Sequence, residues 1–295
     1  MTQGRIAGVL APITTPFDRT TGEVAPVRLR DNAARLVQDG LDGVVVAGST
    51  GESALLDPDE QRRMVACVRD VLPDHRWLLA GTGAESTRQA VALTRAAGAE
   101  GADAVLVRPP SYYSAAVSPA SLSDYYRAVA DASPIPVLVY NIPKYTHLPV
   151  AAELLQQLAT HPNIVGVKDS SGDAENLGAY RAAVPAWSVL VGSGSLLHAA
   201  LELGCDGGVL AVACFAARLC AEILSAFRAG DRTRAGSLQQ RLVPLDKEIV
   251  VKLGPAGVKA AMDAVGGGLY GGPVRAPLAP VAAADRERVA QLVVA

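Results

Sequence analysis

Short apolar segments recur eight times along this chain, and each leads through a Gly, Ser or Pro turn into a longer segment with helical spacing. The segments are rich in Val, Leu and Ile and show no polar alternation, which is typical of parallel strands that are covered on both faces. The expected strands are Gly8–Ile13, Gly43–Ala47, Trp77–Gly81, Ala104–Val107, Pro136–Tyr140, Ile164–Lys168, Ser188–Val191 and Gly208–Val212. Eight strands, each followed by a helix, predict an α/β protein with a (β/α)8 TIM barrel.

Amphipathic stretches lie between these strands, and several begin with Ser, Asp or Pro in positions that favour a helix start. The clearest are Pro58–Val71, Ser86–Ala97, Pro119–Ala130 and Val150–Thr160. The alternative architecture is an open doubly wound sheet, which favours a GxGxxG turn after its first strand. That turn reads PITTPFD here, so the barrel is the better interpretation.

The residues after the expected helix Ala216–Ala229 supply no further strand. They read as three helices, at Asp231–Lys252, Pro255–Val265 and Ala282–Val294, with a flexible or tightly turned connector at Gly266–Pro277. We therefore predict a catalytic barrel over residues 1–230 and a C-terminal three-helix extension over residues 231–295.

Composition narrows the class of partner. The net charge is −2 and no basic run occurs, which argues against a nucleic-acid or anionic membrane partner. No segment approaches the ~18 apolar residues of a membrane span. Pro12 and Pro16 break the N-terminal apolar stretch, which argues against a signal peptide. The four cysteines show no CxxC spacing, as expected of reduced thiols in the cytoplasm. A small-molecule substrate is the default partner.

Reacting groups in such barrels lie at the C-terminal ends of the strands. Of the five lysines, only Lys168 ends an apolar strand; the other four lie in a loop or in polar helical segments. Loss of hydration at an apolar barrel mouth favours the neutral amine, which can attack a carbonyl carbon and form a Schiff base. The alternative is a lysine that pairs with Asp169 and reaches solvent.

Two other strand ends favour the catalytic interpretation. Tyr140 ends the fifth strand beside Lys168, and adjacent strands lie ~4.8 Å apart, so its phenol could shuttle a proton. The second strand ends in AGSTGES, where the hydroxyls of Ser49 and Thr50 and backbone N–H groups freed by glycine form a cradle for a carboxylate. The phosphate-loop pattern is absent there. Tyr140 could alternatively fill the barrel top as a packing residue.

No metal or organic cofactor is expected. The four histidines are scattered without a metal-ligand spacing such as HExxH. An iminium ion on a lysine would itself accept the electrons of a broken carbon–carbon bond, so the chemistry needs no further group.

Three motifs, GSTGE, YNIP and GVKDSSGD, occur in this order after the second strand, on the fifth and on the sixth. Together they resemble the dihydrodipicolinate synthase and N-acetylneuraminate lyase family of pyruvate-dependent class I aldolases. The resemblance extends from about Ile6 to Leu278. It implies a barrel with a C-terminal helical domain, a homotetramer and no cofactor.

The resemblance also implies roles for individual residues. Lys168 would form the Schiff base with pyruvate, and Tyr140 would be the acid/base. Ser49, Thr50 and Gly51 would bind the pyruvate carboxylate.

Two further positions follow from the resemblance. The pair in PPSYYSA is similar to a loop in which a tyrosine supports the proton relay across a subunit interface, which points to Tyr113. Two interface aromatics would fit the same sequence. The segment Gly207–Leu210 matches a wall of the pyruvate pocket, which points to Leu210.

The second substrate is where the sequence departs from the family pattern. Dihydrodipicolinate synthases carry an arginine shortly after the strand-five tyrosine, whereas YNIPKYTH has Tyr145 there, beside Lys144. The spacing up to SPIPVLVY and the ending GGPVRAPL are closer to 4-hydroxy-2-oxoglutarate aldolases, although Ser114-Ala115-Ala116 lacks the basic residues associated with those enzymes.

The expected function is a class I aldolase that cleaves or forms a 4-hydroxy-2-oxo acid from pyruvate and an aldehyde or 2-oxo acid. The alternatives are a 4-hydroxy-tetrahydrodipicolinate synthase and a lyase of N-acetylneuraminate or a 2-keto-3-deoxy sugar acid. A keto-acid-binding sensor without turnover is the non-enzymatic alternative.

Overall fold

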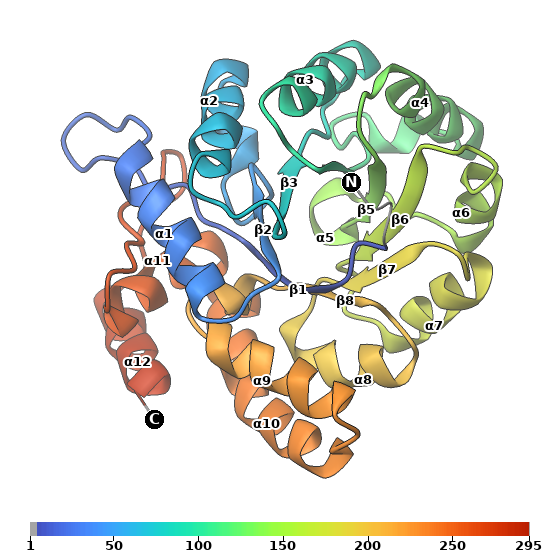
Figure 1. The fold of residues 1–295 in the computed structure, drawn as a ribbon. Coiled ribbons are helices and arrows are strands. Elements are labelled where there is room, and N and C mark those ends of the chain that lie inside the picture. Colours follow the sequence, from blue (N-terminus) through green and yellow to red (C-terminus); the bar gives the residue numbers. More distant parts are fainter. Residues whose placement is uncertain (1–4, 295) are drawn as a thin grey trace.

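A computed structural model describes residues 5–294 and shows a closed barrel of eight parallel strands in chain order, β1 to β8 (Figure 1). The strands are β1 Gly8–Pro12, β2 Gly43–Val46, β3 Trp77–Gly81, β4 Ala104–Val107, β5 Val137–Asn141, β6 Ile164–Asp169, β7 Ser188–Val191 and β8 Gly207–Val209. The predicted (β/α)8 class is confirmed. Seven strands agree with their expected bounds to within a residue, but β8 ends at Val209 and Val212 lies in a 3₁₀ turn.

Helices surround the strands and bury their apolar faces against them (Figure 1). The barrel helices are α1 Pro26–Gln38, α2 Pro58–Arg69, α3 Thr87–Ala99, α4 Pro119–Ala132, α5 Pro143–Thr146, α6 Ala152–Leu158, α7 Ala174–Ala183, α8 Leu197–Glu202 and α9 Ala217–Arg228. Several starts are capped as their sequences predict: Ser86 accepts a hydrogen bond from the Gln89 N–H, and Asp57 and Glu60 form a capping box on α2.

The buried apolar side chains form two layers because successive residues of a strand point to opposite faces. Leu10, Val45 and Leu79 are among those that fill the barrel interior, while Val9 and Val44 belong to the outer layer between strands and helices. This alternation decides which side chain of a strand can reach the barrel mouth.

The C-terminal segment forms α10 Arg232–Leu245, a π-helical turn at Asp246–Val251, α11 Lys252–Val265 and α12 Ala283–Val294. A kink at Gly254, where φ is +60°, separates the helices expected on either side of it. The expectation that Lys259 lies in a polar helical segment is wrong, because this residue is buried and only 1% exposed.

The connector at 266–277 has no helix or strand, but specific contacts fix it to the barrel. The Asn32 side chain donates a hydrogen bond to the Tyr270 carbonyl and accepts one from the Tyr270 N–H, at 2.8 and 2.9 Å. A Cβ at Gly271 would lie 2.0 Å from the Lys259 carbonyl oxygen, so only glycine allows this close approach. Within residues 5–294, no helix has the length and apolarity needed to cross a bilayer.

Candidate active site

Lys168 and Tyr140 occupy paired positions on β6 and β5, in register at the C-terminal end of the barrel. The Lys168 Nζ lies 4.2 Å from the centroid of the Tyr140 ring. Both side chains are buried, at 4% and 6% exposed, yet both line an open cavity. Parallel pairing therefore brings an amine and a phenol to one point, as the strand order predicts.

Lys168 does not pair with Asp169. The Asp169 carboxylate accepts hydrogen bonds of 2.6 Å from the Asn141 side-chain amide and from the Ser171 hydroxyl. Its side chain therefore locks the ends of β5 and β6 together, and Lys168 makes no ion pair with any residue in the described range 5–294. The alternative of a solvent-reaching lysine paired with Asp169 does not fit this geometry.

The loop after β2 closes on itself and presents two hydroxyl-bearing residues to the cavity. The Gly51 N–H donates a hydrogen bond to the Gly48 carbonyl at 3.0 Å. The two residues between these glycines, Ser49 and Thr50, line the cavity. Gly51 is not among the described residues that line the cavity, and its carbonyl accepts a 2.5 Å hydrogen bond from the Thr15 hydroxyl. These two hydrogen bonds fix the shape of the loop.

The cavity that these groups share has a volume of about 240 Å³. This is below the ~300–1,000 Å³ typical of sites for drug-sized ligands, so a small organic acid fits its scale. Its lining includes the hydroxyl-bearing residues Ser49, Thr50, Ser170, Ser171 and Ser193. The remaining lining is largely apolar, from Pro12, Ile142, Val209, Ala211, Val250, Val251, Pro255 and Val258.

Leu210 is not part of this cavity. Its side chain is fully buried in the outer apolar layer, whereas its neighbours Val209 and Ala211 line the cavity. Alternation along the chain therefore directs Leu210 away from the barrel mouth.

Tyr113 also lies outside the cavity of its own chain. It is 72% exposed, and its ring packs edge-on against Tyr112 at 4.8 Å between centroids. Glu85 holds this loop by accepting hydrogen bonds from the N–H groups of Ser111 and Tyr112. Although burial alone raises the pKa of Glu85, these bonds and nearby Arg108 lower it to about 2.

Tyr145 and Lys144 lie at the cavity mouth on α5. Tyr145 is 46% exposed, and partial burial raises the pKa of its phenol. The Lys144 ammonium lies 5.6 Å from the Tyr145 ring centroid and donates to the Val251 carbonyl at 3.3 Å. No arginine is among the described residues that line the cavity.

Comparison with known proteins shows which family this chain resembles. The model of the Dihydrodipicolinate synthetase family matches residues 5–295. The chain belongs to this family. It is 40% identical over 276 residues to an uncharacterized DapA-like lyase of Halobacterium salinarum, covering 92% of this chain and 88% of the relative. It is 37% identical over 278 residues to the 4-hydroxy-tetrahydrodipicolinate synthase of Methanothrix thermoacetophila, covering 93% and 91%.

Solved structures of the dihydrodipicolinate synthetase family have the same fold. The dihydrodipicolinate synthase of Acinetobacter baumannii, complexed with pyruvate, superposes with a TM-score of 0.92 at 30% identity and 98% coverage of both chains. A prophage protein of the family from E. coli K12, also in complex with pyruvate, gives 0.92 at 27% identity and 98% coverage of both chains. The resemblance inferred from the three motifs is confirmed.

The C-terminal segment contributes to the site, which the sequence motifs do not indicate. Asp246, Gly254, Pro255 and Val258 all line the cavity. The Asp246 carboxylate is buried and accepts hydrogen bonds of 2.8 Å from the Ser195 N–H and hydroxyl. The segment is therefore more than a helical addition to the barrel, because it forms one wall of the site.

Proposed function

We propose that the protein is a class I aldolase that forms a Schiff base between Lys168 and pyruvate. The observation that carries this proposal is a buried lysine amine without an ion-pair partner in the described chain, facing a small cavity beside a phenol and two hydroxyl-bearing residues. A lysine amine that faces a small cavity and is not held in an ion pair is placed to attack the carbonyl carbon of a bound keto acid.

Each residue has a defined part in the cleavage of a 4-hydroxy-2-oxo acid. Ser49 and Thr50 bind the substrate carboxylate and orient the 2-keto carbon toward Lys168. The amine adds to that carbon, and loss of water leaves an iminium ion. Tyr140 then removes the proton of the 4-hydroxyl group while the C3–C4 bond breaks, which releases an aldehyde and leaves an enamine. Protonation of C3 and hydrolysis of the iminium release pyruvate and restore the amine.

The preferred substrate is a 4-hydroxy-2-oxo acid, with an activity like that of 4-hydroxy-2-oxoglutarate aldolase. Tyr145 at the mouth supports this choice over dihydrodipicolinate synthesis, because a phenol offers no fixed cationic fork to a second carboxylate. Lys144 supplies one positive charge at the same mouth. The second candidate is a 4-hydroxy-tetrahydrodipicolinate synthase, because relatives of this chain carry that name. A lyase of N-acetylneuraminate or a 2-keto-3-deoxy sugar acid is the third.

We also propose a homotetramer in which Tyr113 acts on a neighbouring subunit. Support comes from the exposure of the adjacent rings of Tyr112 and Tyr113, which lie on a loop held by Glu85. A chain in isolation leaves both tyrosines in solvent. Light scattering of the purified protein and of a Tyr112→Ser/Tyr113→Ser variant tests this assignment.

Borohydride trapping tests the Schiff base directly. Incubation with pyruvate and borohydride should leave reduced pyruvate on Lys168, identified by peptide mass spectrometry, and Lys168→Arg should abolish both the adduct and activity because arginine stays protonated. Lys144→Arg is the matched control, because Lys144 lines the same cavity and its replacement should leave the adduct in place. An adduct at another lysine, or no adduct, contradicts the assignment and favours a keto-acid-binding protein without turnover.

A pyruvate-release assay then ranks the substrates. The panel contains 4-hydroxy-2-oxoglutarate and other 4-hydroxy-2-oxo acids, N-acetylneuraminate and 2-keto-3-deoxygluconate. Condensation of pyruvate with aspartate semialdehyde is measured in parallel.

A further inference from the structure

A buried ion pair lies directly behind the loop that carries Ser49 and Thr50. Glu52, two residues after Thr50, is 3% exposed and pairs with Lys259 of α11, which is 1% exposed. Lys259 follows Val258, a residue of α11 that lines the cavity. The pair therefore joins two walls of the cavity that are far apart in sequence.

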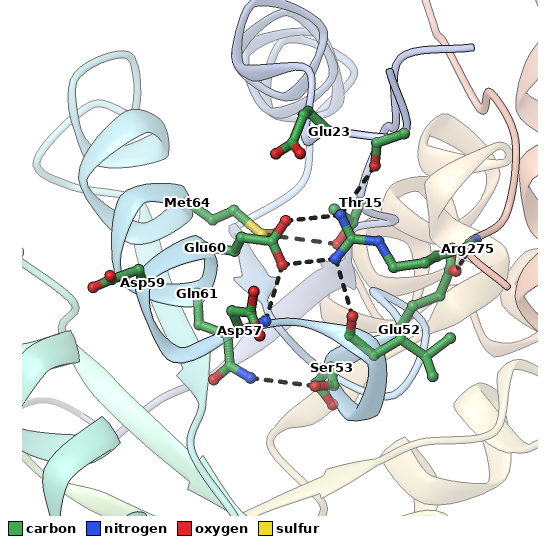
Figure 2. Close-up of polar contacts among 12 residues, drawn as sticks. Thr15, Glu23, Glu52, Ser53, Asp57, Asp59, Glu60, Gln61, Met64 and Arg275 are labelled. Carbon is green, nitrogen blue, oxygen red and sulfur yellow. Dashed lines mark hydrogen bonds and ion pairs between the residues drawn. The ribbon is translucent and has the colours of Figure 1, made fainter. Parts of the chain in front are cut away.

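Both carboxylate oxygens of Glu52 are engaged. Lys259 pairs with Oε1, and the backbone N–H of Arg275 donates to Oε2 at 2.8 Å. Figure 2 shows Glu52 at the backbone end of Arg275 and Glu60 at its guanidinium end. The Lys259 ammonium also donates to the Pro273 carbonyl at 2.6 Å and lies 4.4 Å from the centroid of the Phe17 ring.

The backbone of Glu52 adopts a conformation that needs such support. Its φ of 59° and ψ of 33° are in the left-handed region, which a residue with a Cβ rarely adopts. This conformation turns the chain so that the Glu52 N–H donates to the Ser49 carbonyl at 3.1 Å and the Ser53 N–H to the Gly48 carbonyl at 3.3 Å. We call the segment Gly48–Ser53, which carries Ser49 and Thr50, the hydroxyl loop. Its shape thus depends on Glu52, whose side chain is held by residues outside the loop.

We propose that the Glu52–Lys259 ion pair positions the Ser49–Thr50 loop against α11, and so sets the geometry with which the substrate carboxylate is bound. Glu52 and Lys259 are positioning residues, because neither is among the residues that line the cavity containing Lys168. The inference rests on the proposed function only in taking Ser49 and Thr50 as the carboxylate site.

The position of the pair decides which kinetic constant it controls. Lys168 and Tyr140 are held by β5, β6 and the Asn141–Asp169 hydrogen bond, none of which involves Glu52. Loss of the pair should therefore misplace the hydroxyl loop and weaken binding of the carboxylate, while the amine and the phenol stay in place. Weaker uniform binding raises KM and leaves kcat little changed.

Glu52→Gln is the principal test. Glutamine keeps the size of the side chain and can still accept the Arg275 N–H bond, but it removes the charge that Lys259 faces. We expect the half-saturating pyruvate concentration for trapping on Lys168 to rise by about tenfold or more, with the maximal trapping rate within about threefold of the parent. KM for the best 4-hydroxy-2-oxo acid should rise in parallel. Lys259→Met should act in the same direction, and Lys259→Arg should restore part of the affinity.

Glu60→Gln is the matched control. Glu60 bonds the same arginine, through its guanidinium, but lies on α2 outside the hydroxyl loop. We expect it to lower the melting temperature without changing the half-saturating pyruvate concentration. A merely structural role for Glu52 would make the two variants alike, so equal behaviour of Glu52→Gln and Glu60→Gln overturns the proposal.

Pyruvate affinity is also read from the rise in melting temperature with pyruvate concentration, which requires no covalent step. A parent protein that gains stability from pyruvate but yields no adduct contradicts the Schiff base and still allows the loop to be tested. An adduct of unchanged pyruvate dependence in Glu52→Gln contradicts the positioning role alone. If Lys259→Met does not fold, the isosteric Glu52→Gln and the charge-preserving Lys259→Arg decide the question.

Discussion

Arg275 should be one of the most sensitive positions for stability in the C-terminal connector. Its guanidinium donates two hydrogen bonds to Glu60, at 2.6 and 2.7 Å, and one each to the carbonyls of Leu55 and Gly22 at 3.0 Å (Figure 2). The guanidinium carbon also lies 4.3 Å from the centroid of the Phe17 ring. One side chain therefore ties the connector to α2 and to two loops of the barrel.

Replacement of Arg275 with Met removes these bonds and leaves Glu60 without its cation. Because the Glu60 side chain is only 6% exposed, its carboxylate would be a nearly buried charge with only the Asp57 N–H as a partner. Breaking such a pair costs about 3–5 kcal/mol. For a chain of this size, each kcal/mol lowers the melting temperature by roughly 2 °C, so we expect a fall of about 6–10 °C.

A double-mutant cycle checks that the ion pair causes this loss. Glu60→Gln alone should cost less than Arg275→Met, because the arginine is 23% exposed and keeps its two carbonyl partners. The double variant should be more stable than the sum of the single losses predicts, by more than about 1 kcal/mol in chemical denaturation. Additive losses would refute the reasoning.

The same cycle has a pH signature. Hydrogen bonds from Arg275 lower the pKa of Glu60 below its ordinary value of 4.5, against the opposing effect of burial. The stabilisation is therefore complete above pH 4.5 and is lost as the pH falls through the pKa of the folded state. The difference between the parent and Arg275→Met should shrink below pH 4.5.

Three further outcomes are expected. Tyr140→Phe should keep pyruvate trapping but lower turnover by on the order of 10²–10⁴ if the phenol moves the proton, and a rate within a few-fold of the parent would make Tyr140 a packing residue. Glu85→Gln should lower stability at neutral pH by about 1 kcal/mol after solvent screening of this exposed pair, and the difference should vanish as the pH falls from 4.5 toward about 2, which acid titration of unfolding measures. Tyr145→Arg should improve the use of aspartate semialdehyde beside the best 4-hydroxy-2-oxo acid, because a guanidinium contact to a partly desolvated carboxylate contributes roughly 2–5 kcal/mol, or at least tenfold in kcat/KM. Equal ratios in the parent and Tyr145→Arg would remove Tyr145 as the reason for the substrate ranking.

The barrel and its central pair of residues could be predicted because both follow from local patterns. Apolar runs without alternation mark strands that are buried on both faces, and eight of them in alternation with helices leave few topologies. Consecutive parallel strands then become neighbours, which places Tyr140 beside Lys168. No long-range contact had to be known in advance.

Leu210 shows where the local pattern fails. The apolar run continues to Val212, but the strand ends at Val209 and the chain enters a 3₁₀ segment at Ala211. The resemblance points to the segment Gly207–Leu210 as a whole and does not say which of its side chains faces the cavity. That depends on the phase of the alternation, which places Val209 and Ala211 on the cavity side and Leu210 on the other.

Lys259 fails for a different reason. A lysine within a helix is expected at the surface, and its burial depends on Glu52, which lies in a loop more than two hundred residues earlier. No local pattern links the two positions. The apolar and small neighbours from Val258 to Met262 do indicate that this turn of the helix is buried.

The division of the cavity between two parts of the chain suggests how its substrate preference is set. The amine and the phenol come from the ends of β6 and β5, whose geometry the closed barrel fixes, and Ser49 and Thr50 follow the end of β2. The lining around Tyr145, Val251 and Val258 comes from α5 and from the C-terminal segment. On the proposed mechanism, substitutions at Tyr145 and Val251 alter the part of the cavity that receives the aldehyde and leave Lys168 and Tyr140 in place. Substitutions at Tyr145 or Val251 should therefore change the ranking of aldehydes while the pyruvate dependence of trapping stays constant.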